Sequence, residues 1–154
     1  MFENDNSGLT VLKTLADTLA DSLNGYRDAA QHVEAENFRQ MFTEMADERS
    51  SVLGDLESEV RRRGGDADRD GSTLGYLHQR WLDLKASITG RDDKAVINEV
   101  ERGEDYLKDK FETALGGSLD ADTRAVIERA YGSVRQGHDR VRDLKHALEG
   151  QTAA

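Results

Sequence analysis

Ionisable residues interrupt the apolar spacing of three predicted helices near the middle of each helix. Around Glu48 the apolar positions 38, 41, 45 and 52 continue on both sides, and Arg49 stands beside it. Glu104 falls at the same kind of position among 97, 100, 107 and 111, and His138 falls between 134 and 141. Because burying an unpaired charge is costly, such side chains must neutralise one another or bind an ion.

We expect these side chains to meet in one layer across the middle of the molecule. Each lies near the centre of its helix, so antiparallel packing brings them to the same height whichever way a helix runs. Ser22 and Tyr26 lie at a similar height of the first helix. The predicted polar core layer consists of Tyr26, Glu48, Arg49, Glu104 and His138.

Two chemistries fit such a layer. A carboxylate-bridged metal pair takes one Glu from each of two helices and a Glu-x-x-His from each of two others, with iron or another divalent metal as cofactor. An arginine–carboxylate network satisfies the same acids without metal. The chain contains no Glu-x-x-His, so we expect an ionic layer with no cofactor, and keep a metal site or solvent-exposed side chains as alternatives. The candidate metal ligands are Glu48, Glu101, Glu104 and His138.

Other catalytic motifs are absent or weak. The chain has no cysteine, which excludes thiolate metal sites and cysteine nucleophiles. It has no P-loop, no Gly-x-Ser-x-Gly and no dinucleotide-binding glycine pattern. We predict no catalytic residue; whether the chain is an enzyme stays open, and the incomplete ligand set argues against it.

Amphipathic helices carry these ionisable residues. Apolar residues recur at steps of three or four over most of the 154-residue chain, which has no proline to interrupt a helix. The pattern predicts helices over about 8–32, 35–63, 73–89, 92–115 and 121–149. We expect the second helix to end at Gly64, the fourth at Gly116 and Gly117, and the last at Gly150, and either Asp120 or Asp122 to cap the last helix.

Short turns near 33–35 and 116–120 predict two antiparallel hairpins. The fold class is therefore all-α: an antiparallel four-helix bundle with an additional short crossover helix between the hairpins, in a single domain over 1–154. The crossover helix has an apolar stripe that a four-helix core does not need. This stripe is the predicted interface, with a homo-oligomer, first of all a dimer, or another protein as the partner. Its residues are Leu74, Leu77, Trp81, Leu84 and Ile88.

The net charge and the hydropathy of the chain limit the classes of partner and the cellular location that we expect. The chain has 21 Lys and Arg against 31 Asp and Glu, a net charge of −10, which disfavours nucleic acid as a partner. No window approaches about 18 consecutive apolar residues, and Glu3 and Asp5 stand where a signal peptide needs a basic start. We expect a cytoplasmic protein with no membrane partner. Binding to a membrane surface is a weaker alternative, because the crossover helix offers only Arg80 and Lys85 as cations.

Several blocks of the sequence resemble a known bacterial family over about residues 9–148. These blocks are FTEMADERSSVLGDL, RRRGG, GSTLGYLHQRWLDLK, VINEVERGEDYLKDKF and GHDRVRDLKHAL. They resemble the ferritin-like proteins of domain of unknown function 2383, which implies a ferritin-like four-helix bundle and no assigned activity. The wider ferritin-like superfamily uses inward carboxylates and histidines for di-iron chemistry. Arg135 stands where a Glu would complete Glu-x-x-His with His138, and Ser51 where a His would follow Glu48.

Two functions of different classes follow from these observations. The first is an uncharacterised ferritin-like helical bundle that is not catalytic and acts through self-association or a protein partner. The second is a di-metal carboxylate protein, iron-binding or an oxidase, that uses a degenerate ferritin-like site. Metal content separates the two.

Overall fold

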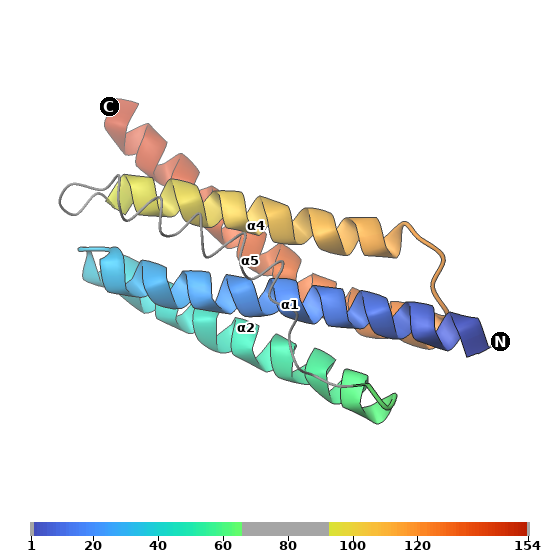
Figure 1. Ribbon diagram of the computed structural model, residues 1–154. Coiled ribbons are helices and arrows are strands. Elements are labelled where there is room, and N and C mark those ends of the chain that lie inside the picture. Colours follow the sequence, from blue (N-terminus) through green and yellow to red (C-terminus); the bar gives the residue numbers. More distant parts are fainter. Residues whose placement is uncertain (1, 66–92, 154) are drawn as a thin grey trace.

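The described residues fold into four long helices, seen in a computed structural model that describes residues 2–65 and 93–153 (Figure 1). The helices are α1 (Phe2–His32), α2 (Glu36–Arg62), α4 (Asp93–Leu115) and α5 (Ala121–Ala153). These residues contain no strand, so the all-α prediction is confirmed. The predicted helix over 73–89 lies outside the described residues, and so does its apolar stripe of Leu74, Leu77, Trp81, Leu84 and Ile88.

The four helices form an antiparallel bundle of two hairpins. α1 and α2 are joined by the turn at 33–35, and α4 and α5 by the turn at 116–120. α1 packs mainly against α2 and α4, while α5 packs mainly against α4 and α2 (Figure 1). Every pair of packed neighbours runs in opposite directions, so residues near the helix centres come to the same height in the bundle.

Two helix ends differ from the prediction. α1 begins at Phe2, before its apolar stripe starts at Leu9. α5 continues through Gly150 to Ala153. One glycine inside a helix costs only about 1 kcal/mol relative to alanine, so the helix is not forced to end there. The other predicted bounds of these four helices agree with the structure within one residue.

Glycines end α2 as the sequence predicts. Gly64 has a φ of 83°, and its amide donates to the carbonyl of Arg61 at 3.0 Å. The amide of Gly65 donates to the carbonyl of Val60 at 2.9 Å, which completes a Schellman motif. A Cβ on Gly65 would lie 2.7 Å from Cδ1 of Leu9, so this turn packs closely against the start of α1.

In each hairpin, an arginine in the first turn of the second helix donates hydrogen bonds to carbonyls at the end of the first helix. The fourth residue of α2, Arg39, donates to the carbonyls of Ala30 at 3.2 Å and Val33 at 3.0 Å. The fourth residue of α5, Arg124, donates to the carbonyl of Leu115 at 2.9 Å. The last carbonyls of a helix have no partner within the helix, so each arginine supplies donors that those groups lack.

One apolar stripe of each helix faces the core. Leu19, Phe42, Phe111 and Val134, one from each helix, are fully enclosed. Among the described side chains of α5, none after Val141 is buried. Within the described ranges, no helix has the length and the apolar content that crossing a membrane would require.

Candidate functional site: a buried ionic layer in the middle of the bundle

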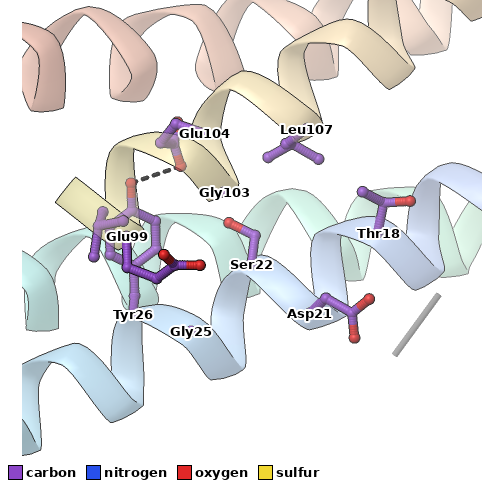
Figure 2. Close-up of a pocket in the computed structure, with 10 residues that line it drawn as sticks. Thr18, Asp21, Ser22, Gly25, Tyr26, Glu99, Gly103, Glu104 and Leu107 are labelled. Carbon is purple, nitrogen blue, oxygen red and sulfur yellow. Dashed lines mark hydrogen bonds between the residues drawn. The ribbon is translucent and has the colours of Figure 1, made fainter. Parts of the chain in front are cut away.

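Tyr26, Arg49 and Glu104 come from three helices and meet in the middle of the bundle. Nη2 of Arg49 lies 2.8 Å from Oε2 of Glu104. The hydroxyl of Tyr26 donates to Oε1 of Glu104 at 2.6 Å (Figure 2). The three residues are only 1–2% exposed, so both carboxylate oxygens of Glu104 are satisfied out of contact with bulk water.

The guanidinium group of Arg49 reaches every helix of the bundle. Nη1 donates to Oγ of Ser22 at 2.9 Å, and Nη2 has a long contact of 3.5 Å to the carbonyl of Val134 on α5. Its Cζ lies 5.5 Å from the centre of the Tyr26 ring. We call Ser22, Tyr26, Arg49 and Glu104 the central layer. Through Arg49 it links the two hairpins.

A glycine on α5 makes room for Arg49. A Cβ on Gly137 would collide with Nη2 of Arg49 and would lie 3.2 Å from Cε of Met45. The guanidinium group therefore lies directly against the backbone of α5. The signal in the sequence was a glycine in the middle of a long helix, next to a predicted layer residue.

Burial and the charge of Glu104 set the protonation of the central layer. Burial, followed by the carboxylate of Glu104, raises the pKa of the Tyr26 phenol well above its usual value. Burial works to lower the pKa of Arg49, but the charge of Glu104 overcomes it and the pKa is raised. Tyr26 therefore keeps its proton, and Arg49 its charge, at the alkaline pH at which solvent-exposed tyrosines begin to ionise.

Glu48 and His138 do not lie in the central layer, which corrects the prediction for both. Glu48 is exposed and accepts a hydrogen bond from Oγ of Ser133 at 2.6 Å. The side chain of His138 is 12% exposed, and its Nε2 lies 2.7 Å from Oδ1 of Asp105. Successive residues of a helix point about 100° apart, so Arg49 and Gly137 face inward where their neighbours were expected.

The four candidate metal ligands take four separate sets of partners. Glu101 pairs with Nζ of Lys145 at 2.9 Å, away from the contacts of Glu48, Glu104 and His138. Across the part of the chain that the structure describes, no group of three or more His, Asp or Glu side chains is placed to hold a metal ion. Since Tyr26 and Arg49 occupy both oxygens of Glu104, these residues do not fit the di-metal arrangement that a ferritin-like fold implies.

A small cavity lies between α1 and α4, beside Tyr26 and Glu104 (Figure 2). Its volume is about 30 Å³, enough for one or two water molecules. A Cβ on Gly103 would meet no atom within 4 Å, so the glycine leaves space along this wall. The polar side chains of its lining are Thr18, Asp21, Ser22, Tyr26, Glu99 and Glu104.

A second polar network, which the sequence did not predict, lies at the end of the bundle where α2 ends and α5 begins. Nη1 of Arg63 donates to Oγ1 of Thr123 at 2.6 Å, and this hydroxyl donates to Oδ1 of Asp120 at 2.5 Å. Nε of Arg63 also pairs with Oε1 of Glu59 at 2.9 Å. We call Glu59, Arg63, Asp120 and Thr123 the end network. A Cβ on Gly8 would lie 2.8 Å from Oγ1 of Thr123, so α1 packs closely over it.

Asp120 caps α5, which settles the choice between Asp120 and Asp122. Its Oδ2 accepts from the backbone amide of Thr123 at 3.0 Å, the usual contact of an N-cap side chain. The hydroxyl of Thr123 and then its amide lower the pKa of Asp120. The signal was present in the sequence as an aspartate followed three residues later by a threonine.

Comparison with known proteins identifies the fold and one family. The model of the family described as Domain of unknown function (DUF2383) matches residues 8–117. The chain is also similar to the crystal structure of a two-domain protein from Anabaena variabilis that contains DJ-1/ThiJ/PfpI-like and ferritin-like domains. The TM-score is 0.74 at 16% sequence identity, with 94% of this chain and 40% of that chain covered. This likeness confirms the predicted ferritin-like fold. No curated protein matches the chain.

Proposed function

The chain belongs to the family of domain of unknown function 2383. We propose that it is a non-catalytic ferritin-like bundle that acts through association. In this proposal the central layer joins the two hairpins and carries no reaction. One observation carries it: both oxygens of Glu104 already pair with side chains of this chain, Tyr26 and Arg49, so a metal or a substrate would have to compete with these partners.

The size and chemistry of the central layer support a structural role. Sites for small organic molecules are typically about 300–1,000 Å³. The cavity beside Glu104 has only about 30 Å³. Tyr26 holds its proton and Arg49 its charge, so neither is a ready acid or base near neutral pH. A buried, fully satisfied network instead favours one arrangement of the helices over others.

Two observations support association: apolar side chains at the surface of the bundle, and the two-domain composition of the similar protein. Phe38 and Met41 on α2 and Leu144 on α5 pack against the core and are partly exposed at the surface of the bundle. The Anabaena variabilis protein carries its ferritin-like domain in one chain with a DJ-1/ThiJ/PfpI-like domain, and this chain spans 40% of that protein. A bundle that works together with a second copy or with another domain accounts for both observations, and a homodimer is the partner we favour.

Metal content tests the proposal that the bundle is not catalytic and holds no di-metal site. The protein is purified without chelators, analysed for bound metal, and titrated anaerobically with Fe(II). We expect far less than one metal per chain and, after oxidation, no near-ultraviolet absorption beyond that of the aromatic side chains. About two bound metals per chain, the number of a di-iron site, would favour the iron-binding or oxidase role instead.

Light scattering tests the proposal that the protein acts through self-association. We expect the mass of a dimer, and the predicted stripe of the crossover segment supplies the variant: Leu77→Ser with Trp81→Ser should lower the mass to that of a monomer. A matched control, Ala125→Ser with Gln136→Ser, changes exposed positions of α5 and should leave the mass unchanged. A wild-type monomer, or a double variant with unchanged mass and stability, would contradict self-association through this stripe.

A further inference from the structure

The contacts of Arg49 describe a site with the shape and charge of a guanidinium ion. Two acceptors lie at its edge, Oε2 of Glu104 at 2.8 Å and Oγ of Ser22 at 2.9 Å. One face is near the ring of Tyr26, with 5.5 Å between Cζ and the ring centre. Gly137 has no side chain, so the guanidinium group lies directly against the backbone of α5. Acceptors at the edge of the group and an aromatic ring against it select a planar cation over a spherical one.

The same surroundings are poor for a divalent metal ion. Zinc takes four nitrogen, sulfur or oxygen ligands and calcium six to eight oxygens, arranged around the ion on all sides. At Arg49 one carboxylate and one side-chain hydroxyl face the positive charge, and the hydroxyl of Tyr26 donates its proton to Glu104. A single negative charge balances a single positive charge, so a divalent ion in this place would leave an uncompensated buried charge.

The cavity between α1 and α4 lies beside the position of the Arg49 guanidinium group. It is lined by Ser22, Tyr26 and Glu104, which are also contacts of Arg49 or of its carboxylate partner (Figure 2). Shortening Arg49 would add the volume of its side chain to a cavity of about 30 Å³ that already lies alongside. The enlarged cavity would present the carboxylate of Glu104, the hydroxyl of Ser22 and the ring of Tyr26, together with the other polar side chains of the existing cavity, Thr18, Asp21 and Glu99.

From these contacts we propose that the middle of the bundle is a binding site for one planar cation, which Arg49 fills from within the chain. The site takes a free guanidinium-type ion when the side chain is removed, and it does not take a divalent metal. The inference deepens the proposed structural role of the central layer and rests on it.

Chemical rescue of Arg49→Ala tests the inference. Thermal unfolding is followed with guanidinium or methylguanidinium chloride at up to about 20 mM, against sodium chloride at equal ionic strength and against Mn²⁺ or Zn²⁺. We expect the guanidinium-type salts to raise the midpoint of the variant by about 3 °C in a saturable way, because a ligand that binds only the folded state stabilises it. Wild type, whose site is filled, should show no such rise.

A double variant identifies the group that binds the cation. Arg49→Ala with Glu104→Gln keeps the cavity and removes the negative charge, so the rescue should disappear. A midpoint that responds equally to sodium chloride, that rises with the divalent metal, or that does not rise at all with the guanidinium-type salts would overturn the inference.

Arg49→Lys gives an independent test that does not need a truncated side chain. Lysine keeps the positive charge but presents it as a compact ammonium, which cannot donate in one plane to both Glu104 and Ser22. We expect a lower midpoint than wild type, and equal stability would contradict a planar site. Metal binding by wild type would refute the proposed function, whereas a metal-free wild type without rescue in the variant would refute only this inference.

Discussion

Arg49 lies inside α2, and Arg63 is the first residue after α2 ends; the two make similar contacts in different surroundings. They are 14 positions apart in the sequence, about 21 Å at the rise of a helix. Each reaches α5, and each network lies against a glycine, Gly137 for Arg49 and Gly8 for the end network. The side chain of Arg49 is 2% exposed and that of Arg63 is 17% exposed.

The comparison shows that the surroundings, more than the contact itself, decide what a polar contact contributes. Removing one partner of a buried pair leaves a charge that water cannot reach, which typically costs about 3–5 kcal/mol. At the end of the bundle water can replace a lost partner, and exposed pairs contribute only about 0–1 kcal/mol. Matched changes in the two networks should therefore differ in size although the distances are alike.

The largest effect is expected for Glu104→Ala. It leaves the guanidinium of Arg49 buried without its carboxylate, and we expect the free energy of unfolding in urea to fall by about 3 kcal/mol. Glu48→Ala is the control, because Glu48 is exposed and accepts its hydrogen bond from Ser133 at the surface of the bundle. This control should cost about 0.5 kcal/mol or less. Equal losses would show that water reaches the central layer.

Gly137→Ala should cost about 2 kcal/mol, even though alanine is the better helix former by about 1 kcal/mol. The added methyl group would displace the guanidinium of Arg49 from α5. Gly132→Ala is the matched control on the same helix, since a Cβ there meets no atom within 4 Å, and it should stabilise the protein. Urea unfolding of both variants measures the difference, and a stabilising Gly137→Ala would contradict the close approach.

Tyr26→Phe and Tyr131→Phe compare a buried and an exposed hydrogen bond of the same length. Tyr26 donates to Glu104 and Tyr131 donates to Glu112, both at 2.6 Å. We expect a loss of about 1.5 kcal/mol for Tyr26→Phe, because the acceptor is a buried carboxylate, and about 0.5 kcal/mol for Tyr131→Phe. Similar losses would mean that burial does not set the contribution of these bonds.

Tyr26→Phe also tests a dependence on alkaline pH. The pKa of Tyr26 is raised in the folded state by burial and by Glu104, so above about pH 10 the unfolded chain releases this proton while the folded chain keeps it. This contribution to stability is complete below about pH 10 and is lost as the pH rises through the folded pKa. The gap between wild type and Tyr26→Phe should narrow from pH 9 to pH 11 in urea unfolding, and a constant gap would contradict the raised pKa.

A smaller effect than in the central layer is expected in the end network. Thr123→Val removes a hydroxyl that contacts both Arg63 and Asp120, and water can reach these two charged partners, so we expect a loss of about 1 kcal/mol. The control Thr113→Val changes an exposed position of α4 and should stay within about 0.5 kcal/mol. A loss as large as that for Glu104→Ala would mean that the end network is as shielded as the central layer.

Unfolding at acid pH gives a second test of the comparison between wild type and Thr123→Val. Thr123 lowers the pKa of Asp120, so its contribution is present above the unfolded value of about 3.9 and is lost as the pH falls through the folded value. The difference between wild type and Thr123→Val in urea unfolding should shrink from pH 5 to pH 3. A difference that grows in acid would show that Thr123 does not act through the carboxylate.

Much of the fold and part of the site could be predicted from the sequence. The apolar spacing predicts all four described helices, Gly64 lies at the predicted end of α2, and Asp120 is one of the two residues predicted to cap α5. Tyr26, Arg49 and Glu104 were placed in one layer, because a charge at a core position near a helix centre can be recognised within a single helix. Glu48 was placed there wrongly, since its spacing is as regular as that of Arg49.

The helices, most of their ends and the kinds of polar residue near their centres follow from the amino-acid sequence alone, because helical periodicity and capping depend on residues a few positions apart. The tertiary structure decided the rotation of α2 and α5 about their axes, and with it the choice of Arg49 over Glu48 and of Gly137 over His138. It also decided the end network, whose members lie up to 64 positions apart, from Glu59 to Thr123. Rotation and axial offset depend on how all four helices pack at once, and no single helix encodes them.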